Sequence, residues 1–230
     1  MKKLICFSLW GETPMYTIGA IKNAELALEL FPDWICRFYI GKSTPQHIID
    51  KLNTFSNTEN IIMDEEGNWE GMFWRFLPAS ESDVQIMLSR DCDSRLSQRE
   101  KSAIDEWLNS DKDFHIMRDH PYHRTAILGG MWGARNSVIK DISKWINEYS
   151  KGDYWQVDQE FLRDVVYPKI KDKVFTHDEF FGSPDIPEYA NFRDFPTKRE
   201  NLFFIGQAFD ENDKVIHPEH MEILKQHINA

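Results

Sequence analysis

The sequence predicts an α/β protein with a parallel sheet, because short apolar runs alternate with segments of helical periodicity from the N-terminus onward. The apolar runs stop abruptly at glycines or charged residues, which is typical of buried strands. In a parallel sheet, ligands bind beyond the carboxyl ends of the strands. We therefore expect functional residues in the loops that follow the strands.

The first half of the chain contains the clearest elements. Strands are expected at Leu4–Trp10, Trp34–Ile40, Ile61–Met63 and Val84–Leu88, with helices at Ile18–Leu30, Pro45–Leu52 and Trp69–Ala79. Strand and helix alternate here, which is the order that places consecutive strands side by side in one parallel sheet.

The second half is less regular. Ser97 and Glu100 match the S-x-x-E capping box, which predicts a helix that begins there and continues to about Leu108. Further strands are expected at Phe114–Met117 and Val174–Thr176, helices at Val138–Tyr149, Tyr154–Val166 and His217–His227, and a surface loop at Ser183–Arg199. No linker divides the chain, so we expect one domain spanning residues 1–230.

Composition excludes several classes of protein. The chain has 230 residues, 41% of them hydrophobic, which is sufficient for one sizeable core. A net charge of -11 disfavours nucleic acid or an anionic membrane as a partner. The three cysteines are far apart, no transmembrane run is present, and the apolar stretch at the N-terminus is too short for a signal peptide. These features predict a cytoplasmic protein with reduced thiols.

Asp91 and Asp93 lie just beyond the apolar run Val84–Leu88, one residue apart. Two carboxylates at a strand end suit a hard divalent cation, which prefers oxygen ligands. Arg90 and Arg95 flank the pair, and a carboxylate–metal site beside arginines suits a diphosphate. The alternative is an exposed turn in which acidic and basic side chains are simply solvated.

Two other stretches are candidates for the same site. The loop from Trp10 to Tyr16 follows the first predicted strand, so it should lie at the same edge of the sheet as Asp91 and Asp93. Gly129, Gly130 and Gly133 surround Trp132, and glycines allow a ligand to approach the backbone closely. The alternative for the glycine segment is a tight turn with a tryptophan in the core.

Six segments carry a resemblance to a known family: Ser8–Ala24, Phe73–Ala79, Arg90–Glu100, Phe114–His123, Leu128–Gly133 and Asp158–Leu162. In this order they resemble the glycosyltransferases of the GT-A fold. More narrowly, they resemble the small glycosyltransferases of large DNA viruses, such as the chlorella virus rhamnosyltransferase domain, and their bacterial polysaccharide relatives. The resemblance implies a mixed, mainly parallel sheet flanked by helices, with a nucleotide-binding half at 1–95 and an acceptor-binding half at 96–230.

The resemblance also implies a metal-dependent transfer of sugar from a nucleotide-diphosphate sugar, with UDP preferred, to a glycan hydroxyl. Mn²⁺ or Mg²⁺ would be held by Asp91 and Asp93, with His177 as a third ligand. The alternative for His177 is a surface histidine beside Asp178. The donor would be bound by Trp10, Gly11, Tyr16, Arg75, Arg90 and Asp91.

An inverting mechanism, assumed by analogy, needs a carboxylate that accepts the proton of the acceptor hydroxyl. Asp158 matches the position of this base in GT-A enzymes, and Asp119 is the second candidate. The alternative for Asp158 is a carboxylate that only stabilises a helix N-terminus. The acceptor would be bound by Gly130, Trp132, Gln159 and His120.

Two functions of other classes are weighed against glycosyl transfer. Phosphatases of the haloacid-dehalogenase type also carry a D-x-D motif, but there it directly follows the first strand and continues with Thr or Val. Here Ser89 and Arg90 precede the motif and Ser94 follows it. A domain of GT-A type that binds a saccharide without transferring it is the other alternative. The sequence leaves the oligomeric state open.

Overall fold

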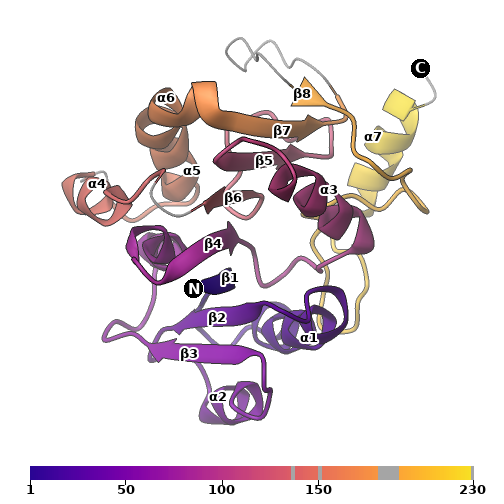
Figure 1. Ribbon diagram of the computed structural model, residues 1–230. Coiled ribbons are helices and arrows are strands. Elements are labelled where there is room, and N and C mark those ends of the chain that lie inside the picture. Colours follow the sequence, from indigo (N-terminus) through magenta and orange to yellow (C-terminus); the bar gives the residue numbers. More distant parts are fainter. Residues whose placement is uncertain (136–137, 150–151, 181–191, 229–230) are drawn as a thin grey trace.

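The computed structural model describes residues 1–135, 138–149, 152–180 and 192–228. Its centre is an eight-stranded sheet with the strand order β3-β2-β1-β4-β6-β5-β7-β8 (Figure 1). The strands are β1 Lys2–Leu9, β2 Ile35–Ile40, β3 Thr58–Ile62, β4 Val84–Ser89, β5 Phe114–Arg118, β6 Trp132–Arg135, β7 Val174–Asp178 and β8 Phe192–Arg193. The expected α/β class, with its mainly parallel sheet, is confirmed.

Among the described strands, β6 alone runs antiparallel to its neighbours, β4 and β5. The other adjacent pairs are parallel. The amino end of β6 therefore lies at the same edge of the sheet as the carboxyl end of β4. Loops that precede β6 and loops that follow β1 and β4 meet at this edge.

Helices cover both faces of the sheet (Figure 1). The α-helices are α1 Pro14–Leu30, α2 Gln46–Leu52, α3 Gln98–Leu108, α4 Ile142–Glu148, α5 Val157–Phe161, α6 Tyr167–Ile170 and α7 Pro218–Ile228. Two 3₁₀ helices, η1 Trp69–Ser80 and η3 Lys171–Lys173, and one π-helix, η2 Leu162–Val166, complete the set. In the described part of the chain, no helix has the length and hydropathy that a membrane crossing requires.

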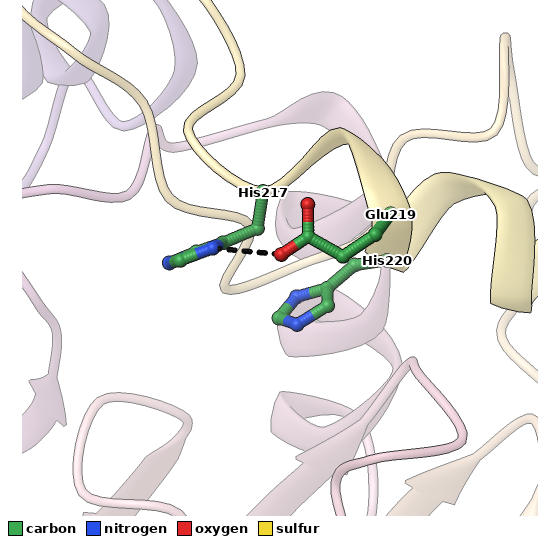
Figure 2. Close-up of side chains that lie close together, drawn as sticks. All are labelled: His217, Glu219 and His220. Carbon is green, nitrogen blue, oxygen red and sulfur yellow. Dashed lines mark hydrogen bonds and ion pairs between the residues drawn. The ribbon is translucent and has the colours of Figure 1, made fainter.

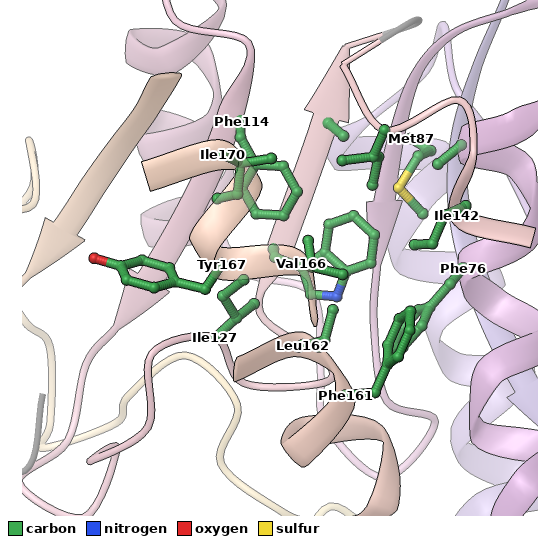
Figure 3. Close-up of a cluster of buried hydrophobic side chains, with 14 of the residues drawn as sticks. Phe76, Met87, Phe114, Ile127, Ile142, Phe161, Leu162, Val166, Tyr167 and Ile170 are labelled. Carbon is green, nitrogen blue, oxygen red and sulfur yellow. The ribbon is translucent and has the colours of Figure 1, made fainter. Parts of the chain in front are cut away.

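The two faces of the sheet carry separate cores, because side chains alternate along each strand. On β1, Leu4 and Cys6 join the cluster beneath η1, α4, α5 and α6, part of which Figure 3 shows. Ile5, Phe7 and Leu9 join the other cluster, beneath α1, α2 and α3. All five side chains are at most 1% exposed, so β1 is a central strand buried on both faces.

Several expected boundaries differ from the structure. The helix expected at Trp69–Ala79 exists but is a 3₁₀ helix, and the one expected at Val138–Tyr149 forms only at Ile142–Glu148. The helix expected at Tyr154–Val166 begins at Val157 and continues as a π-helix. β6 and β8 were not expected, because four and two residues are too few to show a strand periodicity. Residues 183–191 of the expected surface loop lie outside the described residues.

Candidate active site

A pocket of about 380 Å³ lies beyond the carboxyl ends of β1 and β4. The loop after β1, the start of α1 and the turn after β4 form one side of its lining. Residues 128–131, which precede β6, line it together with residues of η1 and the start of α5. Trp155, His123 and Gly206 complete the described lining. The pocket therefore occupies the edge at which the sequence predicts a ligand site.

Asp91 and Asp93 both line this pocket. They lie in the turn that follows β4, where the strand pairing with β1 has ended. Tyr16 lies close to both carboxylates. Burial raises the pKa of the Tyr16 hydroxyl, and the negative charges of Asp93 and Asp91 raise it further. The structure thus brings the D-x-D turn and the loop after β1 into one site.

Helix α1 holds this turn in place through two residues that the sequence analysis did not single out. The buried Asn23 side chain donates hydrogen bonds to the carbonyl oxygens of Cys92 (3.3 Å) and Ser94 (2.8 Å), and accepts one from the amide of Leu96 (3.0 Å). Gly19, one helical turn earlier, packs so closely that a Cβ atom there would overlap the Cys92 carbonyl oxygen. The helix and the turn therefore pack backbone against backbone.

The C-terminal segment holds the same turn from the other side. The amide of Phe209 donates a hydrogen bond to the carbonyl oxygen of Asp93 (2.9 Å). Asp213 forms ion pairs with both Lys22 of α1 and Arg95, at the end of the turn. Helix α1, the D-x-D turn and the segment that precedes α7 are therefore one connected unit.

The pocket carries an excess of negative charge. Asp91, Asp93 and Asp158 are the carboxylates of its described lining, against one guanidinium, that of Arg75. Burial, together with the charge of Asp91, raises the pKa of Asp93 from 3.8 to about 6. Carboxylates that repel one another at a strand end, with oxygen ligands directed into a pocket, fit a hard divalent cation.

Arg75 lies between the two ends of this acidic site. Its side chain is 2% exposed and forms ion pairs with Asp91 and, at 2.9 Å, with Asp158. It also donates a hydrogen bond to the carbonyl oxygen of Arg90 (3.1 Å). A buried arginine with two carboxylates fixes their relative positions, and its removal would leave both charges uncompensated.

Gly129 and Gly130 make this arrangement sterically possible. A Cβ atom on Gly130 would overlap the carboxylate of Asp91, and one on Gly129 would overlap the carboxylate of Asp158. The loop before β6 therefore needs glycine at both positions because the acidic side chains occupy that space. Gly133 lies in β6, where a Cβ would press on Leu88, so its role is packing of the sheet.

Asp158 lies in the first turn of α5 and is 3% exposed. Burial raises the pKa of its carboxyl, and the nearby charge of Arg75 partly offsets this. Gln156, the residue that caps the start of the helix, has a φ of 70°, in the left-handed region that residues other than glycine rarely adopt. Gln159 follows Asp158 and also lines the pocket.

The residues expected on the donor side also line the pocket. Trp10 and Gly11 follow β1, and the amide of Gly11 donates a hydrogen bond to Ser43 (2.8 Å). The Trp10 ring packs edge to face against Trp74, with ring centroids 6.0 Å apart. The loop after β1 is therefore held in place by aromatic packing and by a hydrogen bond, as well as by its attachment to the strand.

Trp69, Met72 and Trp155 line the pocket but were not expected from the sequence. Trp69 and Trp155 are 42% and 66% exposed, which is unusual for tryptophan. The position of Trp155, three residues before Asp158, is the one sequence signal that could have indicated it. Met72 and Trp69 lie in η1, whose apolar residues indicate only a packed helix.

Five of the expected site residues lie outside the pocket that the structure describes. Two of these are Arg90 and Trp132. Arg90 is 2% exposed, pairs with the buried Glu100 and donates to backbone carbonyl oxygens, so it supports the sheet and does not line the donor site. Trp132 is fully buried in β6, where it stacks on Phe114 with ring centroids 5.0 Å apart. It cannot stack on a sugar.

Asp119 and His120 are also held elsewhere. The Asp119 carboxylate is fully buried between Arg99 (2.9 Å) and Arg199 (2.6 Å), which together neutralise it. The ring of His120 accepts a hydrogen bond from the amide of Tyr122 and contacts the carbonyl oxygen of His220. These contacts stabilise the second half of the chain and leave neither side chain facing the pocket.

The structure also places His177 away from Asp91 and Asp93. Its ring lies fully buried in β7, where one nitrogen is 2.8 Å from the ring of His115 and the other 3.1 Å from Glu106. A metal ligand needs a free nitrogen, so His177 is not suited to complete the site. In the described lining, His123 is the one histidine, and burial, with the positive charge of neighbouring groups, holds its pKa well below the usual value.

One other group in the described chain could hold a metal ion: His217, Glu219 and His220, at the start of α7 (Figure 2). His217 lies 3.1 Å from Glu219, and both side chains are more than half exposed. None of the three lines the pocket. The group is therefore separate from the acidic site at the sheet edge.

The structure was compared with known protein families and with solved structures. No protein-family model matches the sequence, and no curated protein matches it significantly. A glycosyltransferase involved in glycosylation of the PBCV-1 major capsid is 17% identical with a TM-score of 0.51, covering 78% of this chain and 82% of that chain. The mannosyltransferase PcManGT of Pyrobaculum calidifontis, in complex with GDP-Man and Mn²⁺, is 9% identical with a TM-score of 0.52, covering 87% and 59%.

Two further structures show the range of proteins with this architecture. S. aureus TarS in complex with UDP is 12% identical, with a TM-score of 0.53, covering 84% of this chain and 60% of that chain. A 4-diphosphocytidyl-2C-methyl-D-erythritol synthase from Anaerococcus prevotii is 11% identical, with a TM-score of 0.50, covering 100% and 99%. Activity depends on the site residues more than on the fold. What the likeness establishes is that this chain has the GT-A fold.

Proposed function

We propose that this protein is a metal-dependent glycosyltransferase that moves a sugar from a nucleotide-diphosphate sugar to a hydroxyl of a glycan. One observation carries the proposal. In a GT-A fold, Asp91, Asp93 and Asp158 converge on one pocket beyond the carboxyl ends of β1 and β4. Similar folds hold UDP in TarS and GDP-Man with Mn²⁺ in PcManGT.

Asp91 and Asp93 would hold Mn²⁺ or Mg²⁺. Such an ion supplies positive charge that stabilises the departing diphosphate. The protein contributes the positions of the two carboxylates, which Asn23 and Phe209 fix through the backbone of the turn. Burial and, after it, the charge of Asp91 raise the pKa of Asp93, and a bound cation would favour the ionised carboxylate against both effects.

The donor would occupy the side of the pocket formed by residues 1–95. Trp10, Gly11 and Tyr16 would contact the nucleoside, for which UDP is preferred, and Arg75 would stabilise phosphate charge. Residues 96–230 would supply the acceptor side, with Gly130 and Gln159 beside it. A reducing, cytoplasmic location is part of the proposal; the three cysteines, which are free and buried, are suited to it.

Asp158 is the proposed base of an inverting transfer. Its carboxylate lines the pocket, whereas that of Asp119 is buried between two arginines. Burial raises the pKa of Asp158, which makes its carboxylate a better proton acceptor. Asp158→Asn should keep donor binding but lower transfer by ~10²–10⁴-fold, because that is the usual contribution of a general base.

The first experiment is a thermal-shift and calorimetry screen of UDP, GDP, CDP and dTDP sugars with and without Mn²⁺. We expect one donor to bind only with the metal, and Asp93→Ala to abolish this binding. Asp105→Ala, which removes a half-exposed carboxylate paired with Lys101 on α3, is the matched control and should bind normally. Equal metal-dependent affinity in wild type and Asp93→Ala would refute the metal assignment.

The product identifies the reaction. Glycosyl transfer releases a nucleoside diphosphate, whereas a nucleotidyl transfer, such as the likeness to the Anaerococcus enzyme would suggest, releases pyrophosphate from CTP. Two other outcomes would indicate a different function. Hydrolysis of a phosphomonoester without a sugar nucleotide would indicate a phosphatase, although the acidic pair follows β4 and not β1, which weighs against a phosphatase. Binding of the donor without any transfer would indicate a domain that only binds saccharides.

A further inference from the structure

Two indole rings remain open to solvent at the pocket. Trp155 is 66% exposed and Trp69 is 42% exposed, although both line the cavity. Large aromatic side chains are normally mostly buried on folding, and exposed ones that surround a cavity are typical of a binding surface. Nothing in the described core packs over these rings, so their contribution to stability is small.

The backbone that carries the two rings is fixed by a hydrogen bond and by an unusual backbone conformation. The amide of Trp69 donates a hydrogen bond to the side chain of Asp153 (2.7 Å), which joins the start of η1 to the segment before α5. Gln156, with a φ of 70°, then turns the chain sharply into α5. A residue other than glycine in this conformation costs free energy and persists where the surrounding structure requires it. The indole of Trp155 is thereby placed on the same segment as Asp158.

We propose that Trp155 and Trp69 form an acceptor subsite that binds an electrically neutral sugar ring. Trp69 belongs to the half at 1–95, but the hydrogen bond from its amide to Asp153 places it where that half meets the acceptor side. This inference rests on the proposed glycosyltransferase function and specifies its acceptor. A pyranose presents an apolar face of C–H groups and a polar rim of hydroxyls. An indole provides a large, rigid surface for the face, and Gln159 and Asp158, four and three residues later, provide hydrogen-bonding groups for the rim.

The charge of the pocket selects among sugars. Asp91, Asp93 and Asp158 outnumber Arg75 in the described lining, and the whole chain has a net charge of -11. A divalent ion and the donor diphosphate largely neutralise each other, so they leave this excess in place. A uronic acid or a phosphorylated sugar at Trp155 would be repelled, whereas a neutral hexose or deoxyhexose would not.

The test measures the binding of small sugars to the protein, so it does not require the natural acceptor. The probes are methyl glycosides of glucose, galactose, mannose and rhamnose, together with the methyl glycosides of glucuronic and galacturonic acid. Saturation-transfer NMR would be recorded with UDP and Mg²⁺, which unlike Mn²⁺ is diamagnetic, for wild type, Trp155→Ala, Trp155→Phe and Trp69→Ala. Phe203→Ala is the matched control, because Phe203 is 44% exposed but lines a different cavity.

We expect at least one neutral glycoside to bind the wild type, and its affinity to fall about 10-fold or more in Trp155→Ala, since ring stacking is typically worth this much. Trp155→Phe should retain part of the affinity and Phe203→Ala all of it. The uronides should bind at least about 10-fold more weakly than the matched neutral sugars.

Three results would overturn the inference: equal affinity in wild type and Trp155→Ala, uronides that bind as tightly as neutral glycosides, or no binding by any neutral glycoside. Failure of the proposed function is a different result. It would appear as the absence of metal-dependent nucleotide binding in wild type, which is measured separately by calorimetry. Thermal unfolding of each variant would establish that the rings were removed without loss of the fold.

Discussion

Replacing Asp93 by asparagine should stabilise the protein at neutral pH when no metal is added. The pKa of Asp93 rises from 3.8 to about 6 on folding, so the folded protein holds this proton more tightly than the unfolded chain does. The stability that this carboxyl contributes is therefore fully present below about pH 4 and is lost as pH rises through about 6. The difference of about 2 units corresponds to a ceiling of ~3 kcal/mol at 1.36 kcal/mol per unit. Because the side chain is partly exposed, solvent should reduce this to about 1–2 kcal/mol.

Urea unfolding of wild type and Asp93→Asn in EDTA, from pH 4 to 8, measures this difference. The variant should be the more stable protein at pH 8, and the two curves should converge near pH 4. Mn²⁺ with UDP should stabilise the wild type but not the variant, because ligand binding to the folded state adds to its stability. A variant that is equally or less stable at pH 8 would refute the electrostatic reasoning.

Asp213→Asn provides a control of opposite sign. Burial alone would raise the pKa of Asp213, but hydrogen bonds from Lys22 and Arg95 outweigh it and lower that pKa. The folded state therefore gains stability from this carboxylate above its unfolded pKa and loses it as pH falls through the lower folded value. Asp213→Asn should be less stable than wild type at pH 8 and approach it in acid.

Three further outcomes test the construction of the site. Asn23→Ala should cost about 1–3 kcal/mol of unfolding free energy by leaving turn groups unbonded, and should weaken metal-dependent UDP binding in calorimetry; wild-type affinity would contradict the assigned role of the turn. Gly130→Ala should lower UDP affinity by displacing Asp91. Gly152→Ala meets no neighbouring atom but has a φ of 105°, so it should cost stability through backbone strain and leave binding unchanged; equal effects on binding would contradict the steric argument. Trp132→Ala should destabilise the fold by ~3–5 kcal/mol in urea, because it empties a core position; a small loss would contradict its burial.

The D-x-D turn could be predicted from the sequence because its signals are local. An apolar run identifies the strand, and the rule that ligands bind beyond parallel strand ends identifies where Asp91 and Asp93 lie. The loop after β1, with Trp10 and Tyr16, follows from the same rule. Gly130 could be predicted because glycine indicates a close approach, although the group that approaches is Asp91 itself and not a ligand.

The role of Trp132 could not be predicted, because it depends on the register of one short strand. Trp132 is paired with Ile116 of β5, so its ring lies on the same face of the sheet as Phe114, two residues away, and stacks on it in the core. Four residues carry no periodicity that reveals either the strand or the buried face. Trp155 lies in a sharply turned segment before α5 and is exposed. Nothing in the sequence around it shows that it, and not Trp132, is the tryptophan at the pocket.

Charged residues were hardest to interpret, because their partners are distant in sequence. Asp119 is paired with Arg99 and Arg199, and the two ring nitrogens of His177 are occupied by His115 and Glu106. From the sequence alone, a buried, paired carboxylate looks the same as one that faces a ligand. Asn23 was missed for the opposite reason. A polar residue within a helix usually faces solvent, but Asn23 is buried and bonds to the turn after β4.

The hydrogen bond between Phe209 and Asp93 has a consequence for synthesis of the protein. The two residues are separated by about half of the chain, and the amide of Phe209 completes the bonding of the turn. A ribosome that has passed the turn after β4 has supplied both acidic residues but not this partner. Contacts between distant segments form late and slow the final stage of folding. A nascent chain should therefore be unable to bind nucleotide tightly until nearly all of it has emerged.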